Sequence, residues 1–229
     1  MIDFDYLATL DFSVPWKYRW QLLSGLWVSF CLMLVSSAAG LAIGIVFAMV
    51  SRTRHAVIRW MIAGYVEFFR NTPLLVQLIW LHFVLPLLTG INTTPLVSGT
   101  LALTLNVTAY FSEIARAGIN SVGRGQWEGA QALGLQAFPT WVRVILPQAL
   151  RVMVPPLAGM VINIFKATAI LSILAIDDLM RVATRISNSA FKPVEMITAA
   201  AVLYLILGSL LALGADRVER KYGPRRQSA

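Results

Sequence analysis

The sequence predicts an all-α membrane protein with five transmembrane helices. Of its 229 residues, 58% are hydrophobic and 13% are charged, whereas about a quarter of the residues of an average soluble domain are charged. The charges are also unevenly placed, because Asp, Glu, Lys and Arg are absent from residues 20–51, 71–112 and 196–215. Uninterrupted apolar stretches of about 18 residues or more are typical of helices that cross a bilayer.

The chain is expected to form one transmembrane domain, residues 22–215, between an N-terminal tail, residues 1–21, and a basic C-terminal tail, residues 216–229. Within this domain the spans are expected at residues 22–50, 58–85, 96–115, 152–176 and 194–215.

Two of these spans carry internal signals. In the first, Ser36, Gly40, Gly44 and Ala48 recur every four residues, which places small side chains on one helical face and predicts a seam where another helix packs closely. The second span contains Pro73. Proline lacks a backbone donor and clashes with the preceding turn, so this span is predicted to kink or break there.

The basic residues predict the orientation of the chain. If the N-terminus lies outside, twelve of the nineteen Lys and Arg residues lie on the inner side, five lie on the outer side and two fall within spans. The positive-inside rule therefore favours a periplasmic N-terminus and a cytoplasmic C-terminus. The net charge of +8 is explained by these flanking residues, and we expect no nucleic-acid partner. Three aspartates precede the first base, unlike a cleavable signal peptide, so the N-terminal tail is expected to be retained.

The inner segment between the third and fourth spans, residues 116–151, is too polar to span a bilayer. We expect two short helices: the first is rich in helix formers and ends at Gly134 in a left-handed cap, and the second has Pro139 in its first turn and stops at Pro147. Such a knob exposes Trp127, Leu133 and Leu135. It either packs on the protein's own helix ends or docks a partner, and composition leaves both alternatives open.

The same segment carries a family motif. Glu128-Gly-Ala, three residues, Gly134, nine residues and then Val-Ile-Leu-Pro147 resembles the EAA loop of ABC-importer permeases, with Gly129 and Val144 as conservative departures. Five stretches resemble the polar amino-acid branch of that family, which includes the histidine, glutamine and glutamate permeases: residues 65–77, 125–128, 133–134, 145–149 and 154–156. The resemblance extends over about residues 22–222 and is closest to glutamate/aspartate-type permeases.

The resemblance implies a type I ABC importer permease, a multi-pass subunit of a bacterial inner-membrane complex. The implied partners are a second permease, identical or related, two ATPase subunits, a periplasmic amino-acid-binding protein and a polar amino-acid substrate. In such complexes the EAA segment is the coupling helix that rests on the ATPase. The residues expected to make this coupling are Gly125, Trp127, Glu128, Ala130, Leu133, Gly134 and Pro147. For Glu128, the alternative role is that of an acid interacting with the dipole at the start of a helix.

A substrate pathway is expected where polar groups lie at membrane depth: Glu67, Asn106, Thr108, Tyr110, Lys166 and Thr168. Ionisable groups at that depth mostly face the bundle interior or a water-filled cavity. Lys166 is therefore interpreted as a counter-charge for a substrate carboxylate, although pairing with Glu113 or snorkelling to the interface is equally compatible. Hydroxyl and amide groups also bond between helices, so packing is the alternative for Asn106, Thr108 and Tyr110.

Where the resembling family commonly has Lys-Asp-Thr-Ser, this chain has Lys166-Ala-Thr-Ala169. The aspartate is missing, which removes a negative charge beside the expected path and favours acidic substrates. The external binding protein usually does most of the selecting in such importers.

No catalytic or cofactor site is expected in this chain. It has no Gly-x4-Gly-Lys-Ser/Thr phosphate loop, so ATP and Mg²⁺ are expected to bind the partner ATPase. Two distant histidines and one cysteine supply no metal-ligand cluster. One rival reading is a self-sufficient channel or carrier, but carriers commonly contain inverted repeats, and five spans do not divide into two equal halves. The other rival, a membrane scaffold, predicts neither a substrate path nor an ATPase partner.

Overall fold

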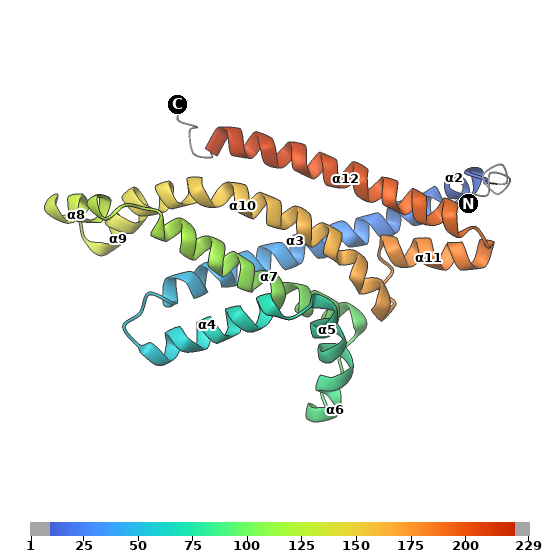
Figure 1. Cartoon of the computed structure of the whole chain (residues 1–229), viewed down its shortest axis with the longest axis horizontal. Helices are drawn as coiled ribbons and strands as arrows, with labels where there is room; N and C mark the ends of the chain where they lie inside the picture. The colour runs from blue at the N-terminus through green and yellow to red at the C-terminus, as the bar shows by residue number, and fades with distance from the viewer. Residues whose placement is uncertain (1–9, 223–229) are drawn as a thin grey trace, which may run out of the picture.

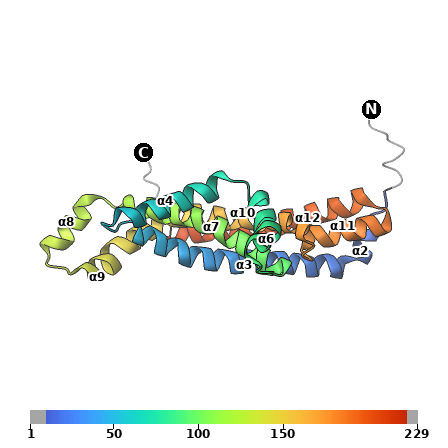
Figure 2. The same cartoon turned by 90° about the horizontal axis from the view of Figure 1, so that it is seen from below.

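The computed structural model describes residues 10–222 as an elongated bundle of helices (Figures 1 and 2). Most of the chain lies in five helices: α3 (Arg19–Val50), α4 (Ala56–Asn71), α7 (Pro95–Asn120), α10 (Leu146–Ala167) and α12 (Pro193–Tyr222). Shorter elements connect or extend them: α2 (Ser13–Lys17), α5 (Leu74–Ile79), η1 (Trp80–Val84), α6 (Leu85–Thr89), α8 (Arg124–Ala132), α9 (Ala137–Pro139), η2 (Thr140–Ile145), η3 (Thr168–Leu174) and α11 (Leu179–Ala190).

Three helical segments of the described chain are long and apolar enough to cross a membrane: Arg19–Val50, Ala137–Leu174 and Pro193–Lys221. A fourth is obtained only if α4 and the limb formed by α5, η1 and α6 count as one broken span. The predicted third span lies within α7, which is helical but is not among these segments. Because α7 packs between α3, α10 and α4, much of its surface faces protein rather than lipid. The count of five spans therefore stays a prediction.

The predicted break at Pro73 is confirmed. Pro73 adopts an extended conformation between α4 and α5. The helix axis bends by 107° from the limb before this break to the limb after it. The limb α5, η1 and α6 consequently leaves the bundle sideways (Figure 1). It ends at Gly90, whose φ of 72° is a left-handed conformation that glycine adopts without steric cost.

Pro147 does not stop the helix, contrary to the prediction. It lies in the first turn of α10, and helix continues from Ala137 to Leu174. The π-helical turn η2 comes directly before it, and η1 stands in the same relation to Pro86 at the start of α6. A proline ring clashes with the carbonyl four residues earlier in a regular helix, and a wider π turn removes that clash.

The small-residue seam of α3 is confirmed by its contacts with α7. A Cβ built on Gly40 would lie 2.4 Å from Val107 Cγ1, and one on Gly44 would lie 2.9 Å from the backbone nitrogen of Ser112. Ser36 and Ala48 are buried on the same face. The backbones of α3 and α7 can approach this closely because the seam carries so little side-chain volume.

The inner segment and the N-terminal end lie at opposite ends of the bundle (Figures 1 and 2). Helices α8 and α9 form one end, and α2 and α11 form the other. The basic tail predicted from residue 216 begins inside α12, which continues to Tyr222. Residues 1–9 and 223–229 of the two predicted tails lie outside the described residues.

Candidate functional site

The inner segment forms a helical knob whose first helix is α8. This helix ends as predicted, because Gly134 follows it with a φ of 70°. The Leu135 amide donates to the Ala130 carbonyl at 3.1 Å, and the Gly134 amide donates to the Gln131 carbonyl at 2.9 Å. These bonds satisfy carbonyls that a helix end otherwise leaves free and fix the turn toward α9.

Trp127 and Ala130 attach the knob to the bundle. Ala130 is buried, and the Trp127 ring packs edge-on against Trp141, with centroids 5.1 Å apart. Arg52, from the connection between α3 and α4, lies 5.2 Å from the Trp127 ring and 5.6 Å from the Trp141 ring. Trp127 was predicted to be exposed. It is instead half-buried, because Trp141 from η2 and Arg52 from the connection between α3 and α4 pack against its ring.

Two large apolar side chains project from the far end of the knob. Leu133 is 82% exposed and Phe138 is 78% exposed. Leu133 was predicted from the sequence, whereas Leu135, also predicted to be exposed, is half-buried. Phe138 was missed, although Pro139 marks the first turn of the second helix at this position. Gly125 and Glu128 are also exposed. Glu128 lies beyond the first turn of α8, which excludes its alternative role at the start of that helix.

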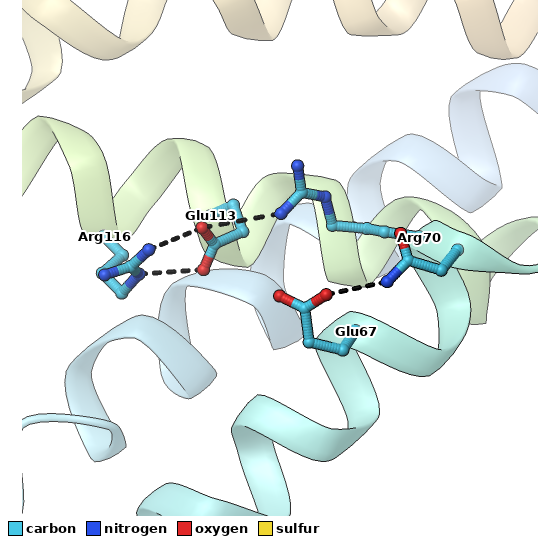
Figure 3. Close-up of polar contacts among 5 residues, drawn as sticks. Glu67, Arg70, Glu113 and Arg116 are labelled. Carbon is cyan, nitrogen blue, oxygen red and sulfur yellow. Dashed lines mark hydrogen bonds and ion pairs between the residues drawn. The ribbon is translucent and has the colours of Figure 1, made fainter.

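A cluster of charged side chains joins α4 to α7 (Figure 3). Arg116 donates two hydrogen bonds to the Glu113 carboxylate, at 2.8 and 2.7 Å. Arg70 forms an ion pair with the same carboxylate at 3.7 Å. Glu67, one turn before Arg70, accepts a hydrogen bond from Asn71 at 2.8 Å. Only Glu67 was predicted as a site residue. The i,i+3 spacing of Glu113 and Arg116 is the signal that points to the others.

Asn106 stabilises the break between α4 and α5. Its amide nitrogen donates to the Phe69 carbonyl and to Gln77 Oε1, both at 3.1 Å. Gln77 in turn donates to the carbonyls of Phe69 and Thr72. Carbonyls that lose their helical partners at the break are thus satisfied by side chains, as buried backbone groups require. This is the packing role that the sequence left open for Asn106.

Thr108 and Thr168 were predicted to line the pathway, but both are buried inside the bundle. Their hydroxyls donate to carbonyls of their own helices, Thr104 and Phe165 respectively, at 2.7 Å. Packing is therefore what the structure shows for these two residues. Tyr110 is half-buried, and Arg70 lies 5.7 Å from its ring.

Lys166 is exposed on the surface of the chain. Among the described residues no acidic side chain forms an ion pair with it, and Glu113, the partner considered from the sequence, binds Arg116 and Arg70 instead. The pairing of Lys166 with Glu113 is therefore wrong. Within residues 10–222 no group of three or more His, Cys, Asp or Glu side chains is placed to hold a metal ion.

Comparison with known proteins assigns the chain to a family. Residues 40–223 match the model of the binding-protein-dependent transport system inner membrane component. The chain belongs to this family. The matched region contains α4, the whole knob and α10 through α12.

Relatives of similar length support the assignment. The L-cystine transport system permease protein TcyB of Bacillus subtilis (strain 168) is 35% identical over 93% of both chains. The putative glutamine transport system permease protein GlnP of Rickettsia bellii (strain RML369-C) is 37% identical over 80% of this chain and 84% of the relative.

A solved structure described as an amino acid ABC transporter with histidines has 31% sequence identity and a TM-score of 0.87, covering 93% of this chain and 99% of that chain. The resemblance to ABC-importer permeases is thereby confirmed. The chain is an inner-membrane component of a binding-protein-dependent transporter. It is a permease subunit and not itself an enzyme, so ATP is hydrolysed by a partner.

Proposed function

We propose that the chain is the permease subunit of an ABC importer for polar amino acids, driven through the knob of residues 124–145. The observation that carries this proposal is the exposed apolar end of the knob, with Leu133 and Phe138 on a rigidly turned helix pair. Exposed apolar surface next to a well-anchored helix is typical of an interaction site. The partner in this proposal is an ATPase subunit, with Glu128 in the contact.

The knob is built to move with the bundle as one body. Its second helix continues without a break into α10 and ends at Leu174. Its first helix is attached through Trp127 to Trp141 and Arg52. Displacement of the knob by closing ATPases therefore shifts α10 directly, which is how ATP hydrolysis is coupled to the substrate pathway in this proposal.

The pathway is proposed to pass Glu67, Arg70, Tyr110 and Lys166. These side chains are exposed or half-buried on the single chain, and charged groups within the hydrocarbon are costly unless they face a cavity or a protein partner. A second permease, identical or related, covers these side chains in the proposed complex, and the polar amino acid passes between the two.

The substrate class is inferred from relatives whose names describe transport of glutamine, cystine and arginine. These names support polar amino acids as a class. Ala167 in place of an aspartate beside Lys166 favours an anionic substrate such as glutamate or aspartate within that class.

Co-purification in mild detergent tests the assembly. Expressed with a co-encoded ATPase and binding protein, the chain is expected to elute with the ATPase and to take up the amino acid that the binding protein selects when titrated against all twenty. A chain that elutes alone and yet transports would establish the rival channel or carrier. A chain that elutes alone and transports nothing would support the scaffold.

In the same reconstituted complex, Lys166→Met tests the pathway. Because it removes a positive charge, uptake of anionic amino acids is expected to fall more than uptake of neutral ones. Lys17→Met, at the end of α2, is the matched control and leaves both unchanged. Equal losses for anionic and neutral substrates would show that Lys166 has a structural role.

A further inference from the structure

A carboxyl group of no assigned role is buried at the end of the bundle opposite the knob. Asp178 immediately precedes α11 and is fully buried. One of its oxygens, Oδ1, accepts the Arg181 amide at 2.9 Å and caps the helix. The other, Oδ2, has no hydrogen-bond partner among the described residues. A helix cap accounts for one oxygen only, so the second is left to be explained.

A tyrosine hydroxyl completes the site from another helix. The Tyr204 hydroxyl, on α12, is also buried and also lacks a partner within residues 10–222. It lies in the immediate electrostatic surroundings of Asp178, together with hydroxyls of Ser29 on α3 and Thr168 on η3. Two buried polar groups, each without a hydrogen-bond partner among the described residues, therefore lie near the junction of α11 and α12.

The packing around this junction is tight. Ser29 Oγ accepts the Leu179 amide at 3.2 Å, and a Cβ on Gly25 would lie 3.0 Å from the Asp178 carbonyl oxygen. The carboxyl is therefore held in place by backbone contacts and cannot swing out to solvent without separating α11 from α3.

No positive charge compensates the carboxyl in the described structure. The groups that act on it are the Tyr204 hydroxyl and the amides of α11. The nearby basic residues are engaged elsewhere, since Arg185 pairs with Asp177 at 2.8 Å and Lys192 pairs with Glu195 at 3.1 Å. An ionised carboxylate buried without a counter-charge is strongly disfavoured. Burial accordingly raises the pKa of Asp178 to about 6, although the α11 amides and Tyr204 oppose the shift.

We propose that Asp178 is a proton-binding site, in which the buried oxygen Oδ2 takes a proton from solvent and the carboxyl group becomes neutral. The proton forms one new O–H bond and removes a buried negative charge that has no counter-charge among the described residues. Asp178 caps α11 at its contact with α3, so the stability of this end of the bundle depends on pH. The site is independent of the coupling knob and of the substrate pathway.

The sign of the pH effect follows from the raised pKa. The folded chain binds a proton that the unfolded chain, with an ordinary aspartate pKa of 3.8, has already released. This contribution to stability is therefore fully present at low pH and is lost as pH rises from about 4 to about 6. Two pKa units correspond to about a 100-fold change in the folding equilibrium.

The test compares Asp178→Asn with Asp177→Asn in the purified full chain. Asparagine mimics the neutral acid, so Asp178→Asn is expected to abolish the fall in thermal stability between about pH 4 and pH 6. Asp177 is exposed and paired with Arg185, so Asp177→Asn retains that fall. Tyr204→Phe retains the titration but shifts it to higher pH, because the hydroxyl that stabilises the ionised carboxylate is removed.

Infrared spectroscopy supplies a readout that folding defects do not imitate. At about pH 5, below the raised pKa, the wild-type spectrum should contain the carbonyl stretch of a protonated carboxylic acid that is absent from Asp178→Asn and present in Asp177→Asn. Absence of that band in the wild-type chain overturns the proposal. Stability that depends on sodium or potassium instead of pH also overturns it, since a cation would then occupy the site.

Discussion

Each end of the bundle carries a short helix, and the two helices differ in how much of their surface is buried. At one end, α11 buries Leu179, Val182, Ala183, Ile186 and Ser187 against α3 and α12. At the other end, α8 buries Ala130 alone and is held by the Trp127 ring, while Leu133 beyond it is almost fully exposed. Helix α11 is therefore part of the core, whereas α8 is presented to another chain.

The difference has an energetic meaning. Burying a leucine or phenylalanine side chain contributes a free energy of about 1.5–3 kcal/mol relative to leaving it exposed. Folding of this chain does not gain that free energy at Leu133 and Phe138, because both side chains stay exposed. In the proposed complex, binding of the ATPase buries these two side chains and gains this free energy. At the other end the same kind of contribution is already used in folding, so changes there should affect stability before they affect transport.

The largest expected effect comes from reversing the charge of Glu128. In the proposed complex Glu128→Arg inserts, and the chain folds normally because the side chain is exposed. Reversal of an interface charge costs about 2–5 kcal/mol in binding, so uptake in reconstituted vesicles is expected to fall at least about tenfold relative to ATP hydrolysis. Glu219→Arg, an equal charge change on α12, is the control and retains uptake. Wild-type coupling in Glu128→Arg would remove this residue from the contact.

A smaller effect is expected from adding one methyl group at each end. The Cβ of Gly25→Ala meets the Asp178 carbonyl oxygen and Leu179 Cα, both at 3.0 Å, whereas that of Gly125→Ala has open space around it. Overpacking costs about 1–3 kcal/mol, so Gly25→Ala should lower the melting temperature in detergent and Gly125→Ala should not. Equal melting temperatures for the two variants would contradict the comparison.

The smallest expected effect is a gain in the stability of α8. Gly129 lies inside α8 with nothing within 4 Å of a built Cβ, and Gly129→Ala restores the Glu-Ala-Ala pattern of the resembling family. Replacing a mid-helix glycine by alanine stabilises a helix by about 0.5–1 kcal/mol. Hydrogen exchange of the α8 amides should slow, with uptake maintained. Faster exchange would indicate that α8 is held by contacts that the added methyl group disturbs.

Features set by backbone chemistry were predictable from the sequence. Gly134 ends α8, Pro73 breaks the helix, and the glycines of α3 form the seam. Each of these depends on one residue type and its immediate neighbours. The family itself was identified from motif spacing in the knob.

Features set by tertiary contacts were not predictable. Pro147 was predicted to end the helix because the amino-acid composition does not indicate the π turn that precedes it. Trp127 looked exposed because Trp141 and Arg52 are distant in sequence. Thr108 and Thr168 looked like pathway residues because polarity at membrane depth does not say which side of a helix faces inward. The Arg70 and Glu113 contact links helices whose register only the fold provides.

The unbroken helix from Ala137 to Leu174 gives the chain mechanical leverage. Its 38 residues extend over about 57 Å at helical rise, so a tilt of about 5° at the knob displaces the far end by roughly 5 Å. That is about the height of one helical turn, and it comes from a rotation small enough to leave the α3 and α7 seam intact.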